Sequence, residues 1–155
     1  MRNLVKVVTV VVLGAAVGAP AAADTMRSSV AFNNGIGKQT ATQPEGGVEV
    51  MYQITLKGGE LEGCTVDIVE QLYPREDGAW GTFFIEGGVT CADGTFEYAS
   101  AGAWDGTGFH AAGPIKGGTG RFDGVTGRVA QVGGGAKPVG NGTAEIFYDL
   151  LIDAS

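Results

Sequence analysis

The sequence predicts a single all-β domain, on the strength of three observations. Short segments alternate apolar and polar residues with a period of two, as strands with one buried face do. Glycine, asparagine and aspartate residues typical of turns separate these segments at intervals of about 8–12 residues. No segment after the N-terminal region keeps a helical period over three turns. Short strands of this kind, about six to eight of them, form either a β-sandwich or a closed β-barrel.

The first 23 residues have the composition of a secretory signal peptide. Arg2 and Lys6 precede an apolar stretch at 7–19, and small residues ending at Ala23 form a cleavage site. The apolar stretch is too short to span a membrane comfortably. We therefore expect cleavage near Ala23 and a secreted or periplasmic domain at 24–155. The short signal and the Ala-, Gly- and Val-rich composition are typical of a bacterial protein.

The charge of the exported part excludes two classes of partner. Removal of the signal peptide leaves eight basic and 17 acidic residues, a formal net charge of −9. Nucleic acids and anionic membrane surfaces both require a basic surface on the protein that binds them. We therefore expect neither nucleic acid nor membrane as a partner after cleavage.

The two cysteines, Cys64 and Cys91, both lie in the exported part. Because exported proteins reach an oxidising compartment, we expect one disulfide bond, with Cα atoms about 4.4–6.8 Å apart. The alternative is a reactive thiol, which normally leaves one cysteine unpaired or places the two in a C-x-x-C motif.

The strands follow from the alternation in chain order. We expect them at 48–56, 64–72, 80–86, 95–104, 108–113, 129–132 and 142–152. The polar segment before them contains a short strand at 29–32 and a turn signal at 33–35. Two glycines at 87–88 are expected to end the third strand. The glycine-rich segment 133–142, which contains Pro138, is expected to be a loose loop.

The same alternation predicts which side chains point inward. Four inward positions carry aromatic residues: Tyr52, Phe96, Tyr98 and Tyr148. We take these four residues and Arg121 as candidate ligand-binding residues. Each tyrosine combines an apolar ring with one hydroxyl, which suits a ligand cavity as well as a packed core.

Glu70 is the candidate catalytic residue. It lies on the inward face of its strand between Ile68 and Leu72, where a carboxylate loses its hydration. Burial raises the pKa of a carboxyl group and suits it to act as an acid or base. The alternatives are a position at the rim near the strand end, or an ion pair with Arg121 or Arg75.

Other catalytic motifs are absent from the sequence. His110 is the only histidine, which excludes a site with several histidine ligands, and no nucleophile-elbow motif accompanies it. The glycines near the C-terminus match neither a phosphate-binding loop nor a dinucleotide-binding fingerprint. We therefore expect no metal ion and no other cofactor.

One glycine-rich stretch resembles a known family. Residues 115–129 read IKGGTGRFDGVTGRV, with Phe122 and Val125 expected to point inward and Gly127 to begin a strand. This stretch resembles the C-terminal motif of the allene oxide cyclase and dirigent families of small, calycin-like β-barrels. The likeness extends through the closing strand at 142–152 and is loose before residue 115.

The resemblance implies a single antiparallel β-barrel of about eight strands, rather than a sandwich. Such a barrel is just wide enough inside for side chains or for one small ligand. Allene oxide cyclases use a glutamate and a held water on an apolar fatty-acid epoxide, and dirigent proteins use aspartates and an arginine to guide coupling of radicals. Those residues lie on N-terminal strands that this sequence does not match, so no catalytic residue is transferred.

Three functions are compatible with these observations. The first is an exported barrel that binds a small apolar molecule without transforming it. The second is a cofactor-independent cyclase or isomerase that uses Glu70. The third is a structural envelope protein whose barrel is filled by its own side chains. Phe147 and Leu151 make the outer face of the closing strand half apolar, so a homo-oligomer is a further expectation.

Overall fold

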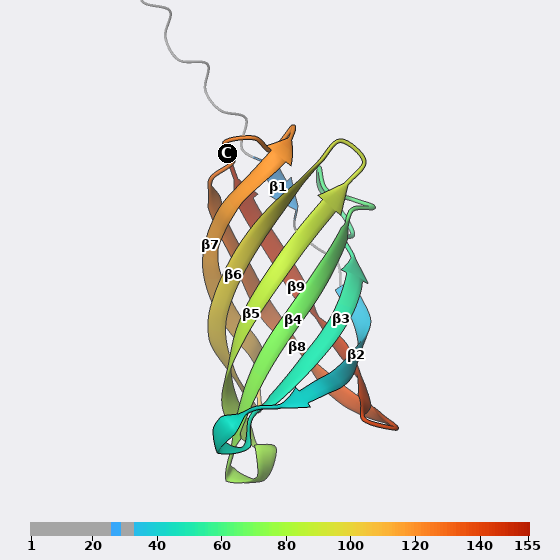
Figure 1. The fold of residues 1–155 in the computed structure, drawn as a ribbon, viewed down its shortest axis with the longest axis vertical. Coiled ribbons are helices and arrows are strands. Elements are labelled where there is room, and N and C mark those ends of the chain that lie inside the picture. The colour runs from blue at the N-terminus through green and yellow to red at the C-terminus, as the bar shows by residue number, and fades with distance from the viewer. Residues whose placement is uncertain (1–25, 29–32) are drawn as a thin grey trace, which may run out of the picture.

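A computed structural model describes residues 26–28 and 33–155 of the chain. Within these residues, nine strands form one antiparallel sheet (Figure 1). The strands are β1 (Met26–Ser28), β2 (Asn33–Thr42), β3 (Val48–Thr55), β4 (Thr65–Arg75), β5 (Trp80–Cys91), β6 (Gly94–Asp105), β7 (Gly108–Gly120), β8 (Gly127–Gly140) and β9 (Thr143–Ala154). Short 3₁₀ turns, η1 (Pro44–Gly46) and η2 (Glu76–Gly78), precede β3 and β5.

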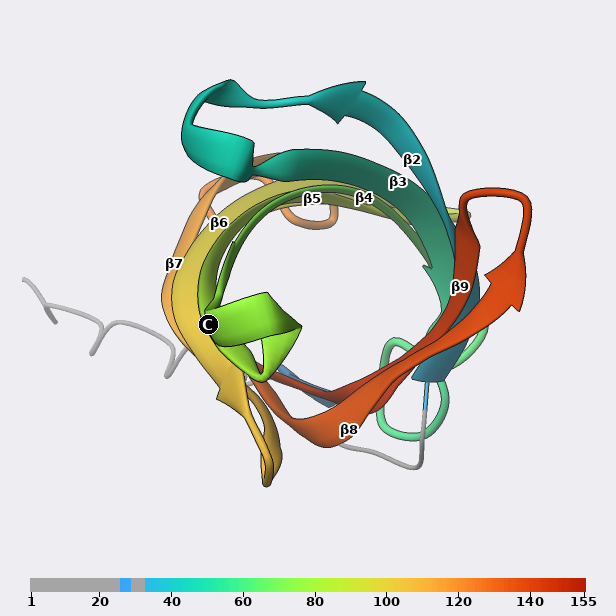
Figure 2. The same ribbon diagram turned by 90° about the horizontal axis from the view of Figure 1, so that it is seen from below.

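Eight of these strands are hydrogen-bonded in a ring. Each strand from β2 to β9 pairs with the next, and β9 pairs with both β8 and β2, which closes the sheet (Figure 2). The short β1 pairs with the end of β9 at Ile152–Ala154. The all-β prediction and the expected number of strands are confirmed in this form. The expected signal peptide and the strand predicted at 29–32 lie outside the described residues.

Alternation along the strands separates the inside of the ring from its outside. In β3, β4 and β9 the predicted inward positions are buried or partly buried, and the intervening positions are mostly more exposed. The buried apolar side chains of β3 to β9 form one continuous core inside the ring. This burial supplies the hydrophobic stabilisation of the fold, because apolar side chains on both sides of the ring meet across it.

The disulfide closes one end of the ring. Cys64, just before β4, is bonded to Cys91 at the end of β5, and their Cα atoms are 4.6 Å apart, within the expected range. Leu61 of the preceding loop is fully buried at this end. The predicted bond is confirmed, and it is typical of proteins from oxidising compartments.

The glycine-rich stretch packs at the same end. β7 continues to Gly120, seven residues beyond the end predicted at 113, and a tight turn at 121–124 leads to β8. Phe122 and Val125 are buried as predicted, and the Phe122 ring meets Phe96 edge-on at 5.1 Å. Gly127 begins β8, as expected.

The turn predicted at 33–35 is wrong. These residues begin β2, which pairs with β9 from Asn33 to Lys38 and with β3 from Lys38 to Thr42. The polar and glycine-rich sequence of this segment does not indicate a strand, because the apolar side chains that it packs against belong to the neighbouring strands. A Cβ atom at Gly37 would meet the side chains of Ile146 of β9 and Val50 of β3, which would have to shift, so glycine fits the packing there.

The strand end predicted at Gly87–Gly88 is also wrong, since β5 continues to Cys91. Gly87 is an inward position, and a Cβ atom there would collide with the ring of Tyr98 on β6. The glycine therefore makes room for a large side chain inside the ring and does not end the strand. Pairing with β4 and β6 on both sides keeps the segment extended.

The loop predicted at 133–142 is replaced by a longer β8. Gly133 and Gly134, with φ angles of 68° and 74°, together oppose the single residue Tyr148 of β9, so the glycines form a β-bulge. Pairing of β8 with β7 reaches only to Gly133 among the described residues. Pro138 lies beyond this point on an edge, where a missing N–H is tolerated.

No helix in the described part of the chain is long and apolar enough to cross a membrane.

Candidate functional site

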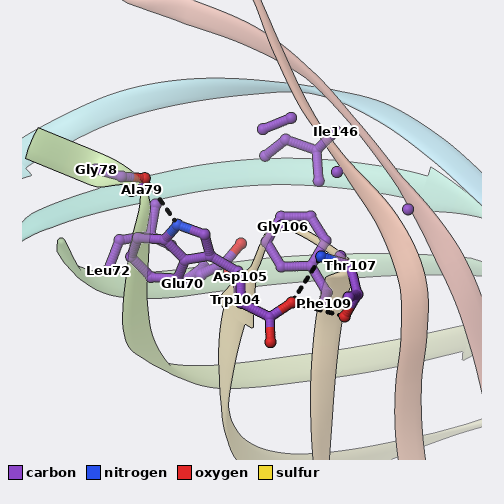
Figure 3. A pocket seen from close by; sticks show the side chains of 14 residues that line it. Glu70, Leu72, Gly78, Ala79, Trp104, Asp105, Gly106, Thr107, Phe109 and Ile146 are labelled. Carbon is purple, nitrogen blue, oxygen red and sulfur yellow. Dashed lines mark hydrogen bonds between the residues drawn. The ribbon is translucent and has the colours of Figure 1, made fainter. Parts of the chain in front are cut away.

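A pocket of about 500 Å³ lies at the end of the ring opposite the disulfide. It opens beside the place where β8 leaves β7, between the β6–β7 turn and the β8 residues after the bulge. η2 projects over the inside of the ring at this end (Figure 2). The lining comes from five strands, β4, β6, β7, β8 and β9, and its larger side chains are shown in Figure 3: Glu70, Leu72, Trp104, Asp105, Phe109 and Ile146.

Trp104 forms one wall of the pocket and fixes η2. Its indole Nε1 donates a hydrogen bond of 3.3 Å to the carbonyl oxygen of Gly78. Its ring packs against Phe83 at 6.3 Å, and Phe83 meets Phe109 nearly at a right angle at 5.6 Å. Aromatic pairs in such geometries stabilise each other beyond their buried area. The wall is therefore held by packing and by a hydrogen bond.

The β6–β7 turn forms the rim. The amide and the hydroxyl of Thr107 both donate to Asp105 Oδ1, at 2.7 and 2.6 Å, and these bonds lower the pKa of Asp105. Since the hydroxyl hydrogen of Thr107 goes to Asp105, its oxygen accepts the 2.9 Å bond from His110 Nε2. This direction is the reverse of the one in which a histidine activates a hydroxyl nucleophile. The three residues therefore hold an ionised carboxylate at the rim.

Glu70 lies at the floor of the pocket. Its side chain is 2% exposed, and it stands between Val50 of β3 and Ile85 of β5 in the sheet. Burial raises the pKa of Glu70 from 4.5 to about 7, and a hydrogen bond from the Tyr52 hydroxyl offsets part of this effect. The inward position and the raised pKa are as the alternation predicts.

Arg121 does not neutralise Glu70. Its Nε lies 3.1 Å from Asp93 Oδ1, and its guanidinium group stacks on the Phe122 ring at 4.6 Å, at the disulfide end. Arg75 is exposed at the end of β4. The ion pair considered between Glu70 and Arg121 is thus wrong, because Arg121 lies at the disulfide end and is paired with Asp93.

A cluster of tyrosines lies behind Glu70. The hydroxyl oxygens of Tyr52 and Tyr148 are 3.1 Å apart and hydrogen-bonded, and their rings meet edge-on at 6.4 Å. Burial raises the pKa of Tyr52, Tyr98 and Tyr148, and the charge of nearby Glu70 raises it further. All three tyrosines therefore stay neutral and supply hydroxyl groups near the carboxylate.

Two further polar side chains extend this cluster inside the ring. Ser100 Oγ donates to Gln131 Oε1 at 3.3 Å. The Gln131 amide is close enough to Tyr148 to lower the pKa of that hydroxyl, yet its Nε2 makes no hydrogen bond in the described structure. The Tyr98 hydroxyl also has no partner among the described residues. Gln131 was missed from the sequence, although the alternation from Val129 predicts that it points inward.

The structure brings together only part of the predicted site. Tyr52, Tyr98 and Tyr148 gather near Glu70, but Phe96 and Arg121 lie near the disulfide. None of these five candidate ligand-binding residues lines the pocket itself. Its walls, Trp104 and Phe109, were not among the residues predicted from the sequence. A signal was present, because both flank the Asp105-Gly106 turn and so lie where two strands reach one end of the ring.

The described residues contain no group of three or more His, Cys, Asp or Glu side chains that could hold a metal ion. Comparison with known proteins gives no family for the chain: no family model, no curated protein and no solved structure matches it significantly. The resemblance to allene oxide cyclases and dirigent proteins therefore remains a likeness of one glycine-rich segment, and the candidate site has to be interpreted from its own geometry.

Proposed function

We propose that this protein is an exported eight-stranded β-barrel that binds a small, mainly apolar molecule at its open end without transforming it. One observation carries the proposal: a pocket of about 500 Å³ has apolar and aromatic walls and one buried carboxyl group at its floor. Small-molecule sites typically have about this volume and combine apolar walls with a few polar groups that orient the ligand.

Packing within the ring supports a ligand at the end rather than along the whole interior. The disulfide end is filled by side chains such as Phe96 and Phe122, and the middle by the tyrosines. The interior therefore has in part the character of the filled barrel that a structural protein would have. The pocket beside Trp104 and Phe109 is the part of it that suits a ligand.

A specific observation favours a second function, a cofactor-independent isomerase or cyclase. The pKa of Glu70 is raised to about 7, close to the value at which a general acid or base works best at neutral pH. Glu70 would be the residue that moves a proton of the bound molecule. The resemblance to allene oxide cyclases agrees with this alternative.

Binding can be tested with the neutral apolar dye N-phenyl-1-naphthylamine. Ala136 is an exposed residue that lines the pocket, so Ala136→Phe would fill it. Ala101→Phe adds the same side chain on the outer face of β6 as a control. We expect the wild-type protein and the control to bind the dye and Ala136→Phe to lose it. Failure of the wild type to bind, or equal binding by both variants, would contradict the proposal.

Native mass spectrometry of protein purified from its own host would identify a retained ligand. Incubation of that ligand with fresh protein distinguishes the two functions. An unchanged ligand supports binding alone, whereas conversion that is lost in Glu70→Gln supports the isomerase.

A further inference from the structure

The charges that line the pocket define the class of ligand. Fourteen residues line it, and the charged ones among them are two acids, Glu70 and Asp105. No lysine, arginine or histidine belongs to the lining, although η2 and β8 both contribute to it. An anionic ligand would meet carboxylates with no cation to offset them, so the lining opposes carboxylic acids and phosphates.

The two carboxyl groups stand at different depths in the same pocket. Glu70 lies buried at the floor, and Asp105 lies exposed at the rim, where the two hydrogen bonds from Thr107 hold it in place. A positive group could therefore be attracted at the entrance and then paired with the buried carboxylate. A buried charge is costly unless it is paired, so a cation at the floor also removes the cost of ionising Glu70.

The walls add a second feature that suits a cation. Trp104 and Phe109 line the same pocket as the two carboxyl groups, and Trp104 is only partly buried. Aromatic faces attract ammonium groups and also pack against flat apolar rings. The exported chain as a whole carries a net charge of −9, which favours the approach of cations over anions.

We propose that the pocket selects organic cations, specifically a protonated amine carried on a flat apolar body. The inference rests on the proposed function, since it names the class of molecule that the same pocket binds. The ammonium group pairs with Glu70, the ring packs against Trp104 and Phe109, and Asp105 guides entry.

Three probes with the same ring and different charges test this proposal: 1-naphthylmethylamine, 1-naphthalenemethanol and 1-naphthoic acid. Their affinities are measured by calorimetry at pH 8. We expect the amine to bind at least tenfold more tightly than the alcohol and the acid not to bind. Equal or tighter binding of the alcohol or the acid would overturn the selectivity while leaving the binding function intact. Absence of binding by all three probes would overturn both.

Variants of the two acidic residues test whether the preference for the amine depends on their carboxylates. We expect Glu70→Gln and Asp105→Asn each to weaken binding of the amine at least fivefold and to leave the alcohol unchanged. Glu97→Gln, on the exposed outer face of β6, is the matched control and should affect no probe. Because Asp105 lies on an exposed turn, its variant tests the proposal even if Glu70→Gln fails to fold. An amine preference that persists in both acid variants would contradict the proposal.

Discussion

At the scale of single residues, Glu70 determines how stability depends on pH. Its pKa is 4.5 in an exposed carboxyl group and about 7 in the folded protein. Between these values the folded state keeps a proton that the unfolded state releases, so stability falls as the pH rises. At pH values below the lower pKa, Glu70 does not destabilise the folded state, and above the higher pKa the destabilisation is complete.

We expect Glu70→Gln to remove this pH dependence. The pKa of Glu70 is higher in the folded state than in the unfolded state. Between pH 4 and pH 8 the wild type should therefore lose about 3 kcal/mol more free energy of unfolding than the variant. Urea unfolding at the two pH values measures the difference, and Glu97→Gln serves as the control. Parallel pH profiles for wild type and Glu70→Gln would show that the carboxyl group is not desolvated.

Tyr52 should be the residue that keeps the pKa of Glu70 from rising further. Its hydroxyl bonds the carboxyl group and lowers that pKa, so Tyr52→Phe is expected to raise the pKa above about 7. Carbon-13 NMR titration of the glutamate carboxyl groups gives the value directly. Tyr98→Phe also removes a buried hydroxyl, but one without a hydrogen-bond partner in the described structure, and should leave the pKa in place.

The affinity for a cation should rise with pH. Around Glu70 the titratable groups are Tyr52 of β3, Tyr98 of β6 and Tyr148 of β9, which burial keeps neutral, and the ionised Asp105 at the rim. From β5, β7 and β8 the neighbours Ile85, Phe109 and Gln131 carry no charge. Among the groups that face it inside the ring, Glu70 is therefore the one whose ionisation changes between pH 6 and pH 8. Calorimetry with 1-naphthylmethylamine should show up to about a tenfold gain, and a flat profile would assign the attraction to Asp105 alone.

At the scale of strands, neighbouring glycines of β5 have different structural roles. Gly87→Ala places a methyl group against the Tyr98 ring and should destabilise the protein by about 1–3 kcal/mol. Gly88 has open space around its Cβ position, so Gly88→Ala should leave stability unchanged or slightly higher. Thermal unfolding of the two variants makes the comparison. Equal effects would mean that Tyr98 does not depend on the gap at Gly87.

The strands also show what the sequence could and could not predict. Strict alternation in β3, β4 and β9 reveals their buried faces, including the inward position of Glu70. Glycines in β5 and β8 suggested loops, because their roles depend on side chains and pairing in the neighbouring strand: the Tyr98 ring for Gly87 and β9 for the bulge. The pocket walls escaped for the same reason, since Trp104, Ile146 and Glu70 meet only when the ring closes.

At the scale of the whole molecule, the two ends of the ring should respond differently to loss of the disulfide. Cys64 and Cys91 are 27 residues apart in the sequence, and the disulfide closes the loop between them. Replacement of both by serine opens this loop, and chain entropy predicts a loss of about 3–4 kcal/mol in the free energy of unfolding. The pocket lies at the other end, so dye affinity should be unchanged while the variant remains folded. Urea unfolding and dye titration measure the two effects, and a joint loss of stability and affinity would show that the ends are coupled.

The end of the pairing between β7 and β8 also affects whether two copies of the protein can associate through their strands. Beyond Gly133, the edge of β8 that faces away from β9 presents backbone groups that could template a strand from another chain. This edge carries Lys137 and Pro138 and is bent by irregular pairing at both of its ends. Charge, a missing N–H and local twist all discourage strand addition. These features of the β8 edge beside the pocket therefore protect the protein from aggregating through that edge.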